Sequence, residues 1–222
     1  MGLKDKPIEG DPGRGIPHNP CINSGAMMMC SMVFPEIESE EERLEKVIAY
    51  WKELSGGPNA PIDVDWATYK SESGSADRNW CLAYMMRERH SWPPCFSYKG
   101  TKSLNDTLEL YFQICSILST NRAMSIMSAT LANGGLNPMS GVRICDPVHV
   151  RCALPLMLTC GMYDYSGQWA FDVGIPAKSG VGGCVFMVIP NVCGISVWSP
   201  RLDEIGNSAR AVHTAKELVK KL

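Results

Sequence analysis

Apolar side chains recur at the 3.6-residue spacing of amphipathic helices through most of the first 160 residues. The spacing is clearest in residues 36–54, where one face carries Leu44, Val47, Ile48, Trp51 and Leu54. The segment Gly56-Gly57-Pro58 then ends this helix. The same pattern predicts further helices over residues 20–34, 75–88, 103–120, 121–133 and 146–160, the last opened by Asp146-Pro147.

After residue 160 the pattern changes to short runs rich in Val, Ile, Phe and Trp, which are typical of strands. These runs cover residues 169–174, 182–189 and 194–198, and Pro190-Asn191 indicates an antiparallel hairpin between the last two. Residues 205–222 form a closing amphipathic helix. Helices followed by three antiparallel strands and a final helix indicate an α+β fold.

We expect a single domain with three parts. Residues 1–17 form a loop, residues 18–160 a mainly helical part, and residues 161–222 a sheet part with the C-terminal helix. A three-stranded sheet has two edges with unpaired backbone groups, which readily pair with further polypeptide. The sequence therefore indicates that this sheet is incomplete by itself.

Composition excludes several classes of protein. The 222 residues contain 21 Lys and Arg against 23 Asp and Glu, so the net charge of −2 argues against binding to nucleic acid or an anionic membrane through bulk charge. The apolar runs are too short to span a bilayer. The N-terminal residues lack the apolar core of a secretory signal.

Metal and disulfide sites are not predicted. The ten cysteines include no C-x-x-C pair, and a chain of this size does not need disulfides to fold, so we expect most of them to be small buried hydrophobic residues in a reducing compartment. The four histidines lie apart from one another and from acidic clusters: His18, His90, His149 and His213.

Two polar segments precede predicted helices. HNPCINSGA (residues 18–26) offers the amides of Asn19 and Asn23, which suit a polar ligand, although the pattern alone favours capping of a helix start. SESGSADRN (residues 71–79) gathers Glu72 and Asn79, which suit an ammonium and a carboxylate or amide. An acid-rich helix start is the simpler interpretation of this second segment taken alone.

Two further segments lie near the predicted sheet. CGMYDYSGQWAFDVG (residues 160–174) contains Tyr163, which could relay a proton or could belong to a polar connection. PAKSGVGG (residues 176–183) contains a Lys-Ser-Gly box similar to that of penicillin-recognising serine hydrolases, where glycines let backbone N–H groups approach an oxyanion.

Six segments taken in order resemble the serine-dependent glutaminases, above all the animal kidney-type and liver-type enzymes: HNPCINSGA, SESGSADRN, LYFQICSI, TLANGG, CGMYDYSGQWAF and PAKSGVGG. The resemblance implies a partial fold of the serine β-lactamase and penicillin-binding-protein type. It also implies hydrolysis of L-glutamine through a serine acyl-enzyme, without metal or organic cofactor, in a homotetramer. An animal-type protein would act in mitochondria and a bacterial-type one in the cytoplasm.

The resemblance assigns roles to individual residues. It implies substrate contacts at Asn23, Glu72, Asn79, Tyr111, Tyr163 and Val181. Glu72 would meet the α-ammonium of glutamine, and Asn23 its α-carboxylate. Tyr163 would relay a proton, and the backbone N–H of Val181 would complete the oxyanion hole. No metal-binding residue is implied.

The sequence departs from the family at the nucleophile. The family's S-x-x-K box, in which Lys activates Ser, precedes the segment that corresponds to residue 1, and none of the serines here begins such a box. We therefore expect either a piece of a longer glutaminase or a catalytically dead paralogue with a binding or assembly role, and in both cases no hydrolysis by this chain alone. A penicillin-binding protein is a third interpretation of residues 160–183, but Glu72 and Asn79 argue against it.

Overall fold

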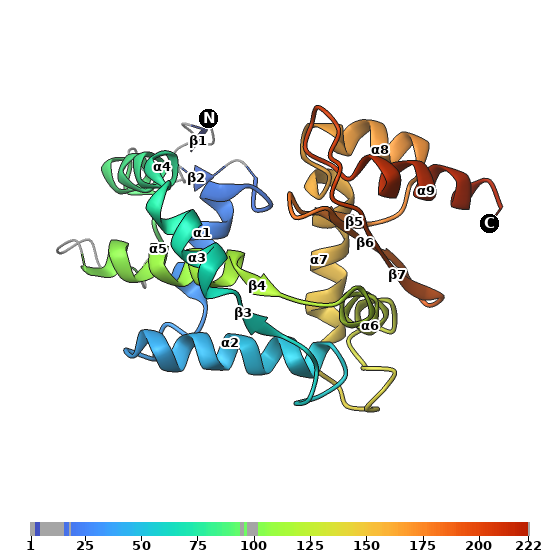
Figure 1. Ribbon diagram of the computed structural model, residues 1–222, viewed down its shortest axis with the longest axis horizontal. Helices are drawn as coiled ribbons and strands as arrows, with labels where there is room; N and C mark the ends of the chain where they lie inside the picture. Colours follow the sequence, from blue (N-terminus) through green and yellow to red (C-terminus); the bar gives the residue numbers. More distant parts are fainter. Residues whose placement is uncertain (1–2, 5–15, 18, 94–95, 97–101, 222) are drawn as a thin grey trace. The chain divides into compact units, whose positions relative to one another are not determined.

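The computed structural model describes residues 3–4, 16–17, 19–93, 96 and 102–221 and divides into two compact units (Figure 1). Unit 1 comprises Met1–Ile48 and Asp63–Leu118, and unit 2 comprises Ala49–Ile62 and Ser119–Leu222. Most of the predicted loop over residues 1–17 lies outside the described residues, as do His18 and Cys95. Within that loop, β1 (Leu3–Lys4) pairs antiparallel with β2 (Ile16–Pro17).

Unit 1 is built mainly from helices. They are α1 (Asn23–Met32), the first part of α2 (Glu40–Leu54), α3 (Trp66–Gly74), α4 (Asp77–Glu88) and α5 (Lys102–Cys115). A two-residue ladder joins β3 (Asp63–Val64) to β4 (Ile117–Leu118). Helix α5 packs against α1 and α3, and α1 also packs against α4.

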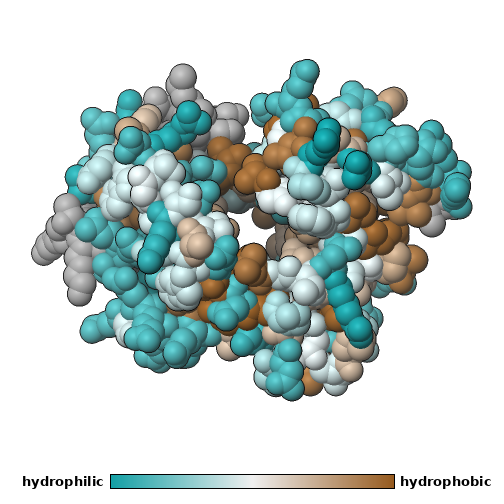
Figure 2. Space-filling model, in the orientation of Figure 1, coloured by the Kyte–Doolittle hydropathy of each residue, from teal (hydrophilic) through white to brown (hydrophobic). Residues whose placement is uncertain are grey.

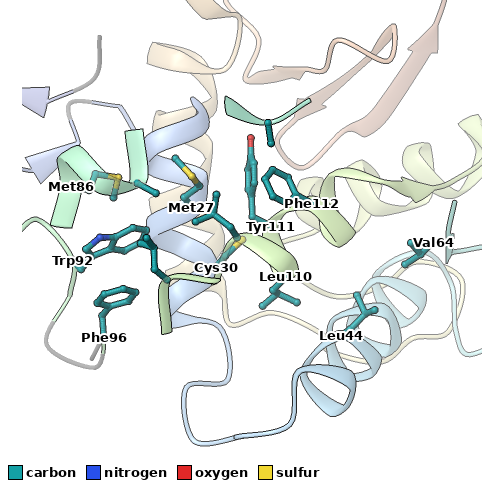
Figure 3. Packing of buried hydrophobic residues seen from close by; sticks show 14 residues of the cluster. Met27, Cys30, Leu44, Val64, Met86, Trp92, Phe96, Leu110, Tyr111 and Phe112 are labelled. Atoms are coloured by element: carbon teal, nitrogen blue, oxygen red, sulfur yellow. The ribbon is translucent and has the colours of Figure 1, made fainter. Parts of the chain in front are cut away.

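The core of unit 1 lies between α1, α4 and α5, and Figure 3 shows its buried side chains. Met27 and Cys30 of α1 meet Tyr111 and Phe112 of α5 within this cluster. Helix α2 adds Leu44 from its apolar face. Its other face is charged, and hydrophilic residues cover the visible side of this helix (Figure 2).

Unit 2 is a three-stranded antiparallel sheet between two pairs of helices. The strand order is β5 (Ala177–Ser179), β6 (Cys184–Ile189), β7 (Cys193–Trp198). The helices are α6 (Asn121–Ala132), α7 (Pro147–Cys160), α8 (Ser166–Asp172) and α9 (Ala209–Val219), and the 3₁₀ turn η1 (Tyr163–Tyr165) precedes α8.

Alternation along β6 divides the core of unit 2 into two layers. Val185 and Met187 pack into the cluster formed with α8 and α9, whereas Phe186 and Val188 pack into the cluster formed with α6 and α7. Helix α6 lies very close to β7, because a Cβ added at Gly194 would stand 2.0 Å from the backbone nitrogen of Ala129. Glycine at this position therefore permits the contact between helix and sheet.

Most predicted elements are confirmed, including the helices α1, α2, α4, α6, α7 and α9 and the hairpin of β6 and β7. The predicted helix over residues 103–120 is too long, because the chain leaves α5 after Cys115 and Ile117 joins the ladder with Val64. Helix α3 was not predicted. It has no buried residue, so it lacks the apolar stripe from which a surface helix is recognised.

The predicted strand over residues 169–174 is wrong, because residues 169–172 belong to helix α8 and the next two residues form its end. Trp169 is fully buried and its indole N–H donates to the carbonyl of Ile175 at 2.7 Å, which favours a helical turn over an extended run. The third strand is β5, which contains Lys178 and Ser179 of the Lys-Ser-Gly box. The expected burial of most cysteines is also wrong, since only Cys30 is buried among the nine described, all of which are free thiols.

Candidate functional site

The amides of Asn23 and Asn79 lie in contact in unit 1. The side-chain nitrogen of Asn23, the first residue of α1, donates a hydrogen bond to the side-chain oxygen of Asn79 in α4 at 2.8 Å. Asn23 is exposed and Asn79 is half-buried. Neither amide caps its own helix, so the capping interpretation does not hold for Asn23. The structure therefore joins two candidate residues 56 positions apart.

Gly25 explains how the HNP turn and α1 come together. A Cβ at this position would stand 2.3 Å from the carbonyl oxygen of Asn19 and 2.5 Å from the Cα of Pro20. The side chain of Asn19 accepts a hydrogen bond from the Cys21 N–H at 2.7 Å, which tightens the turn before the helix. The glycine thus lets the turn lie against the first turn of α1, where Asn23 is placed.

Glu72 and Tyr111 are the second pair in unit 1. Glu72 is exposed near the end of α3, and Tyr111 lies in α5, against which α3 packs. Tyr111 is only 7% exposed, and burial raises the pKa of its phenol, with smaller contributions from the Cys115 thiol and the Glu72 carboxylate. The packing of α3 on α5 is the geometric link between these two candidate residues.

The orientation of Tyr111 suits a contact outside the core. Its ring packs beside Phe112, with ring centroids 5.5 Å apart, and Figure 3 shows its hydroxyl directed away from the apolar cluster. Helix α3 is fixed by Asp65, whose carboxylate accepts hydrogen bonds from the Ala67 N–H and the Thr68 hydroxyl. A hydrogen bond from Tyr69 to Glu109 of α5 raises the pKa of Tyr69 to about 12 and adds a second tie.

Tyr163 and Val181 meet in unit 2. Burial raises the pKa of the Tyr163 phenol, while a hydrogen bond from the Val181 backbone N–H opposes this shift. The Lys178 ammonium lies 4.9 Å from the centroid of the Tyr163 ring. The Val181 side chain is 72% exposed, so this backbone donor lies at the surface of the unit.

Tyr163 has a strained backbone. Its φ of 55° is left-handed, a conformation that costs a non-glycine residue about 1–3 kcal/mol. The buried hydroxyl of Ser166 accepts a hydrogen bond from the Met162 N–H at 3.0 Å and donates one to the Tyr163 carbonyl at 2.7 Å. These contacts offset the strain and fix the start of η1.

The candidate residues thus form two groups, one in each unit. Unit 1 holds a carboxylate, two neutral amides and a phenol in Glu72, Asn23, Asn79 and Tyr111. Unit 2 holds a phenol and a backbone donor in Tyr163 and Val181. The first set suits a zwitterionic amino acid, and the second suits an oxygen that gains negative charge.

Sequence reasoning missed two residues near Tyr163. The sequence analysis did not single out Ser166, and Asn207 gave no signal, although Asn207 is fully buried and its side chain donates to the Met162 carbonyl at 3.3 Å. A local pattern could not predict this contact, because Asn207 is 45 residues away from Met162.

A cavity of about 300 Å³ lies elsewhere in unit 2 and contains none of the candidate residues. It is formed by the loop over residues 55–61, the start of α6 and Met139. Among the residues that the structure describes, no group of three or more His, Cys, Asp or Glu side chains is arranged to hold a metal ion. Within the same ranges, no helix has the length and apolar character needed to cross a bilayer.

Comparisons with known proteins show which family this chain resembles. A family profile described as Glutaminase matches residues 5–222. The chain is 46% identical to putative glutaminase 3 of Caenorhabditis elegans over 205 residues, which are 92% of this chain and 34% of the relative. It is 41% identical to the mitochondrial liver isoform of glutaminase of Mus musculus, and the match covers 92% of this chain and 33% of that relative. A glutaminase of Microcystis aeruginosa is 39% identical, and the match covers 91% of this chain and 56% of that relative.

Solved structures give the same result. A structure titled "Crystal Structure Analysis of Mglu" matches with a TM-score of 0.80 and 38% identity, over 90% of this chain and 48% of that chain. A second structure of the same protein, in its glutamate form, matches equally well over 43% of its chain. These matches confirm the expected α+β fold of the serine β-lactamase type. The chain spans about a third of its animal relatives and about half of the solved chains, and it belongs to the glutaminase family.

Proposed function

We propose that this chain provides the substrate-recognition part of an enzyme that hydrolyses L-glutamine to L-glutamate and ammonia. The observation that carries the proposal is the pairing in unit 1 of the Asn23 and Asn79 amides, together with the packing of α3, which carries Glu72, on α5, which carries Tyr111. Glutamine has a charged amino-acid end and a neutral amide end. One carboxylate with several neutral donors and acceptors complements the first, and a preorganised backbone N–H complements the second.

Each residue has a distinct role in this proposal. Glu72 accepts hydrogen bonds from the α-ammonium, and the amides of Asn23 and Asn79 bind the α-carboxylate end. Tyr111 adds a protonated phenol, and burial moves the pKa of this phenol still further above neutral pH. Val181 donates its N–H to the carboxamide oxygen as negative charge develops there, and Tyr163 passes a proton to the departing ammonia.

The covalent step needs a serine that attacks the γ-carbonyl carbon of glutamine. Its attack expels ammonia and leaves a γ-glutamyl ester, which water then cleaves to glutamate. No S-x-x-K segment occurs among the 222 residues, so this nucleophile must come from other polypeptide. The alternative is a paralogue without catalytic activity that binds glutamine or joins another glutaminase subunit, and the missing box is the observation that favours it.

Ammonia release tests the mechanism. The purified 222-residue chain is incubated with L-glutamine, and ammonia is measured by a coupled dehydrogenase assay. We expect no turnover above the buffer control, because positioning and one oxyanion donor remain without a nucleophile. Turnover that Tyr163→Phe abolishes would show that the nucleophile lies within this chain and would reject the mechanism.

The DNA or transcript sequence that precedes the codon for Met1 distinguishes the two forms of the proposal. An in-frame S-x-x-K box there supports a longer glutaminase, and its absence supports the paralogue. We further propose assembly as a homotetramer and, for an animal-type protein, action in mitochondria. Light scattering of the purified protein and fractionation of cells that express a tagged copy test these two points.

A further inference from the structure

Buried polar side chains hold Tyr163 in an unfavourable backbone conformation, and these side chains have no other evident role. A serine at a helix start commonly accepts a hydrogen bond from an N–H one turn ahead. Ser166 is the first residue of α8, yet its hydroxyl turns back to the Met162 N–H at 3.0 Å and the Tyr163 carbonyl at 2.7 Å. Its hydrogen bonds therefore fix the peptide group before Met162 and the peptide group after Tyr163.

A second buried group acts on the same turn from a distant part of the chain. Asn207 is fully buried, and its side-chain nitrogen donates to the Met162 carbonyl at 3.3 Å. Met162 is thus held through its N–H by Ser166 and through its carbonyl by Asn207. Tyr163 follows directly, so both of its neighbouring peptide groups are fixed.

Asn207 is itself fixed by a tight turn. One carboxylate oxygen of Asp203 accepts hydrogen bonds from three successive N–H groups, of Ile205, Gly206 and Asn207, at 2.9–3.0 Å. The Asp203 N–H also donates to the Asn207 carbonyl at 2.7 Å. This turn stands against the tyrosine, because a Cβ added at Gly206 would lie 3.9 Å from the Tyr163 ring and 4.0 Å from a methyl of Val181.

Three groups therefore contact Tyr163: the hydroxyl of Ser166 bonds its carbonyl, the turn over residues 203–207 lies beside its ring and beside Val181, and Lys178 lies 4.9 Å from the ring centroid. The same turn therefore contacts both residues, and the Val181 N–H lies close enough to the Tyr163 hydroxyl to oppose the rise in the pKa of this phenol. A tyrosine with an ordinary φ at this position would direct its ring elsewhere.

We propose that Ser166 and Asn207 are positioning residues, which hold Tyr163 in its left-handed conformation so that its hydroxyl meets the Val181 N–H. In the protein without substrate, the hydroxyl occupies the donor that a developing oxyanion needs. The phenol keeps this N–H directed toward the site, and it releases the N–H when the carboxamide oxygen arrives. This role in catalysis rests on the proposed glutamine hydrolysis, but the positioning itself does not depend on it.

The test uses the amide resonance of Val181 in ¹H–¹⁵N NMR spectra of the full chain without substrate. Tyr163→Phe removes the acceptor and keeps the ring, so it defines the upfield shift that follows loss of the hydrogen bond. Ser166→Ala is expected to shift the Val181 amide in the same direction and to a comparable extent, and Asn207→Ala likewise. Ser166→Thr, which keeps the hydroxyl, is expected to restore the wild-type position.

Ser125→Ala is the matched control. The hydroxyl of Ser125 also bonds a backbone carbonyl, that of Arg122 at 2.8 Å, but in α6 and without contact with Tyr163, so the Val181 resonance should stay in place. If Ser166→Ala does not give a folded spectrum, the nearly isosteric Ser166→Cys replaces it. A Val181 resonance that Tyr163→Phe leaves unmoved, or that shifts with Tyr163→Phe but not with Ser166→Ala or Ser166→Cys, overturns the proposal.

The experiment distinguishes failure of the positioning role from failure of the proposed function. If L-glutamine does not bind but the Val181 amide responds as described, the positioning role stands and the substrate assignment falls. If L-glutamine binds and the Val181 amide resonance does not shift when Ser166 and Asn207 are changed, the positioning role is wrong and the substrate assignment stands.

Discussion

The side-chain amide of Asn23 donates a hydrogen bond of 2.8 Å to the side-chain oxygen of Asn79, and so connects the start of α1 with the start of α4. In each amide, one polar group is used in this contact. The other group of each remains able to bind a further partner. The contact therefore arranges two amides as a pair rather than as separate surface residues.

Because the two amides interact, their substitutions should not be additive. Asn23→Ala and Asn79→Ala are each expected to lower the free energy of unfolding by about 0.5–1.5 kcal/mol. The double variant should lose less than the sum, with a coupling energy of about 0.5–1 kcal/mol. Urea unfolding of the four proteins measures this energy. Additive losses would show that the hydrogen bond does not form in solution.

The turn before α1 should tolerate no side chain at Gly25. Gly25→Ala places a methyl group 2.3 Å from the Asn19 carbonyl oxygen, so we expect a loss of about 2 kcal/mol or more in the free energy of unfolding. Gly74→Ala is the control, because a Cβ there meets no atom within 4 Å and alanine favours the helix by about 0.5–1 kcal/mol. Equal midpoints of the two variants in urea would contradict the close approach.

The difference between these two glycines also shows what the sequence could and could not predict. The amphipathic helices and the hairpin follow from local periodicity, as in α2, where Leu44 and Val47 are buried. A close approach such as that of Gly25 to Pro20 depends on how the turn folds back, which periodicity does not report. The motif INSG could be recognised only by resemblance.

Helix α8 and strand β5 illustrate a second limit. Trp169 and Val173 have the β propensity that suggested a strand. Both are buried, however, Trp169 within α8 and Val173 four residues later at the end of this helix. Tertiary packing overrides propensity in such short segments. Strand β5 has only three residues, Ala177 to Ser179, and its two buried side chains alternate around Lys178, a pattern too short to recognise.

Acid should weaken the contact between α8 and α9. Asp172 forms an ion pair of 2.7 Å with Lys216 and accepts hydrogen bonds from Gln168 and Tyr165. The hydrogen bond from Lys216, above all, lowers the pKa of Asp172 below its usual range. A carboxyl with a depressed pKa in the folded state adds stability above its unfolded pKa of about 3.9, and this stability is lost as the pH falls further.

Thermal unfolding of the wild type and Asp172→Asn between pH 2.5 and pH 7 measures this contribution. The wild type should be the more stable protein near pH 6, and the difference should vanish at the acid end of the range. A difference that is independent of pH would contradict the assigned role of the carboxylate.

Alkali should destabilise unit 1 through Tyr111. Burial raises the pKa of this phenol, so it stays protonated in the folded protein while the unfolded chain ionises near pH 10. The stability that the protonated phenol contributes is therefore fully present below about pH 10 and falls as the pH rises further. Tyr111→Phe removes this source of pH dependence. Unfolding in urea at pH 8 and pH 11 should show a smaller decline for Tyr111→Phe than for the wild type, and equal declines would contradict a buried phenol.

The most direct measurement of the central claim is a ¹H–¹⁵N NMR titration of the 222-residue chain with L-glutamine. The account predicts shifts among residues around Asn23, Glu72, Asn79 and Tyr111. Glu72→Gln should weaken binding by about tenfold or more, because it removes a charge-assisted hydrogen bond to the α-ammonium. Asp77→Asn, which removes a neighbouring exposed carboxylate, should bind like the wild type. Shifts that avoid these four residues, or equal affinities for Glu72→Gln and Asp77→Asn, would contradict the account.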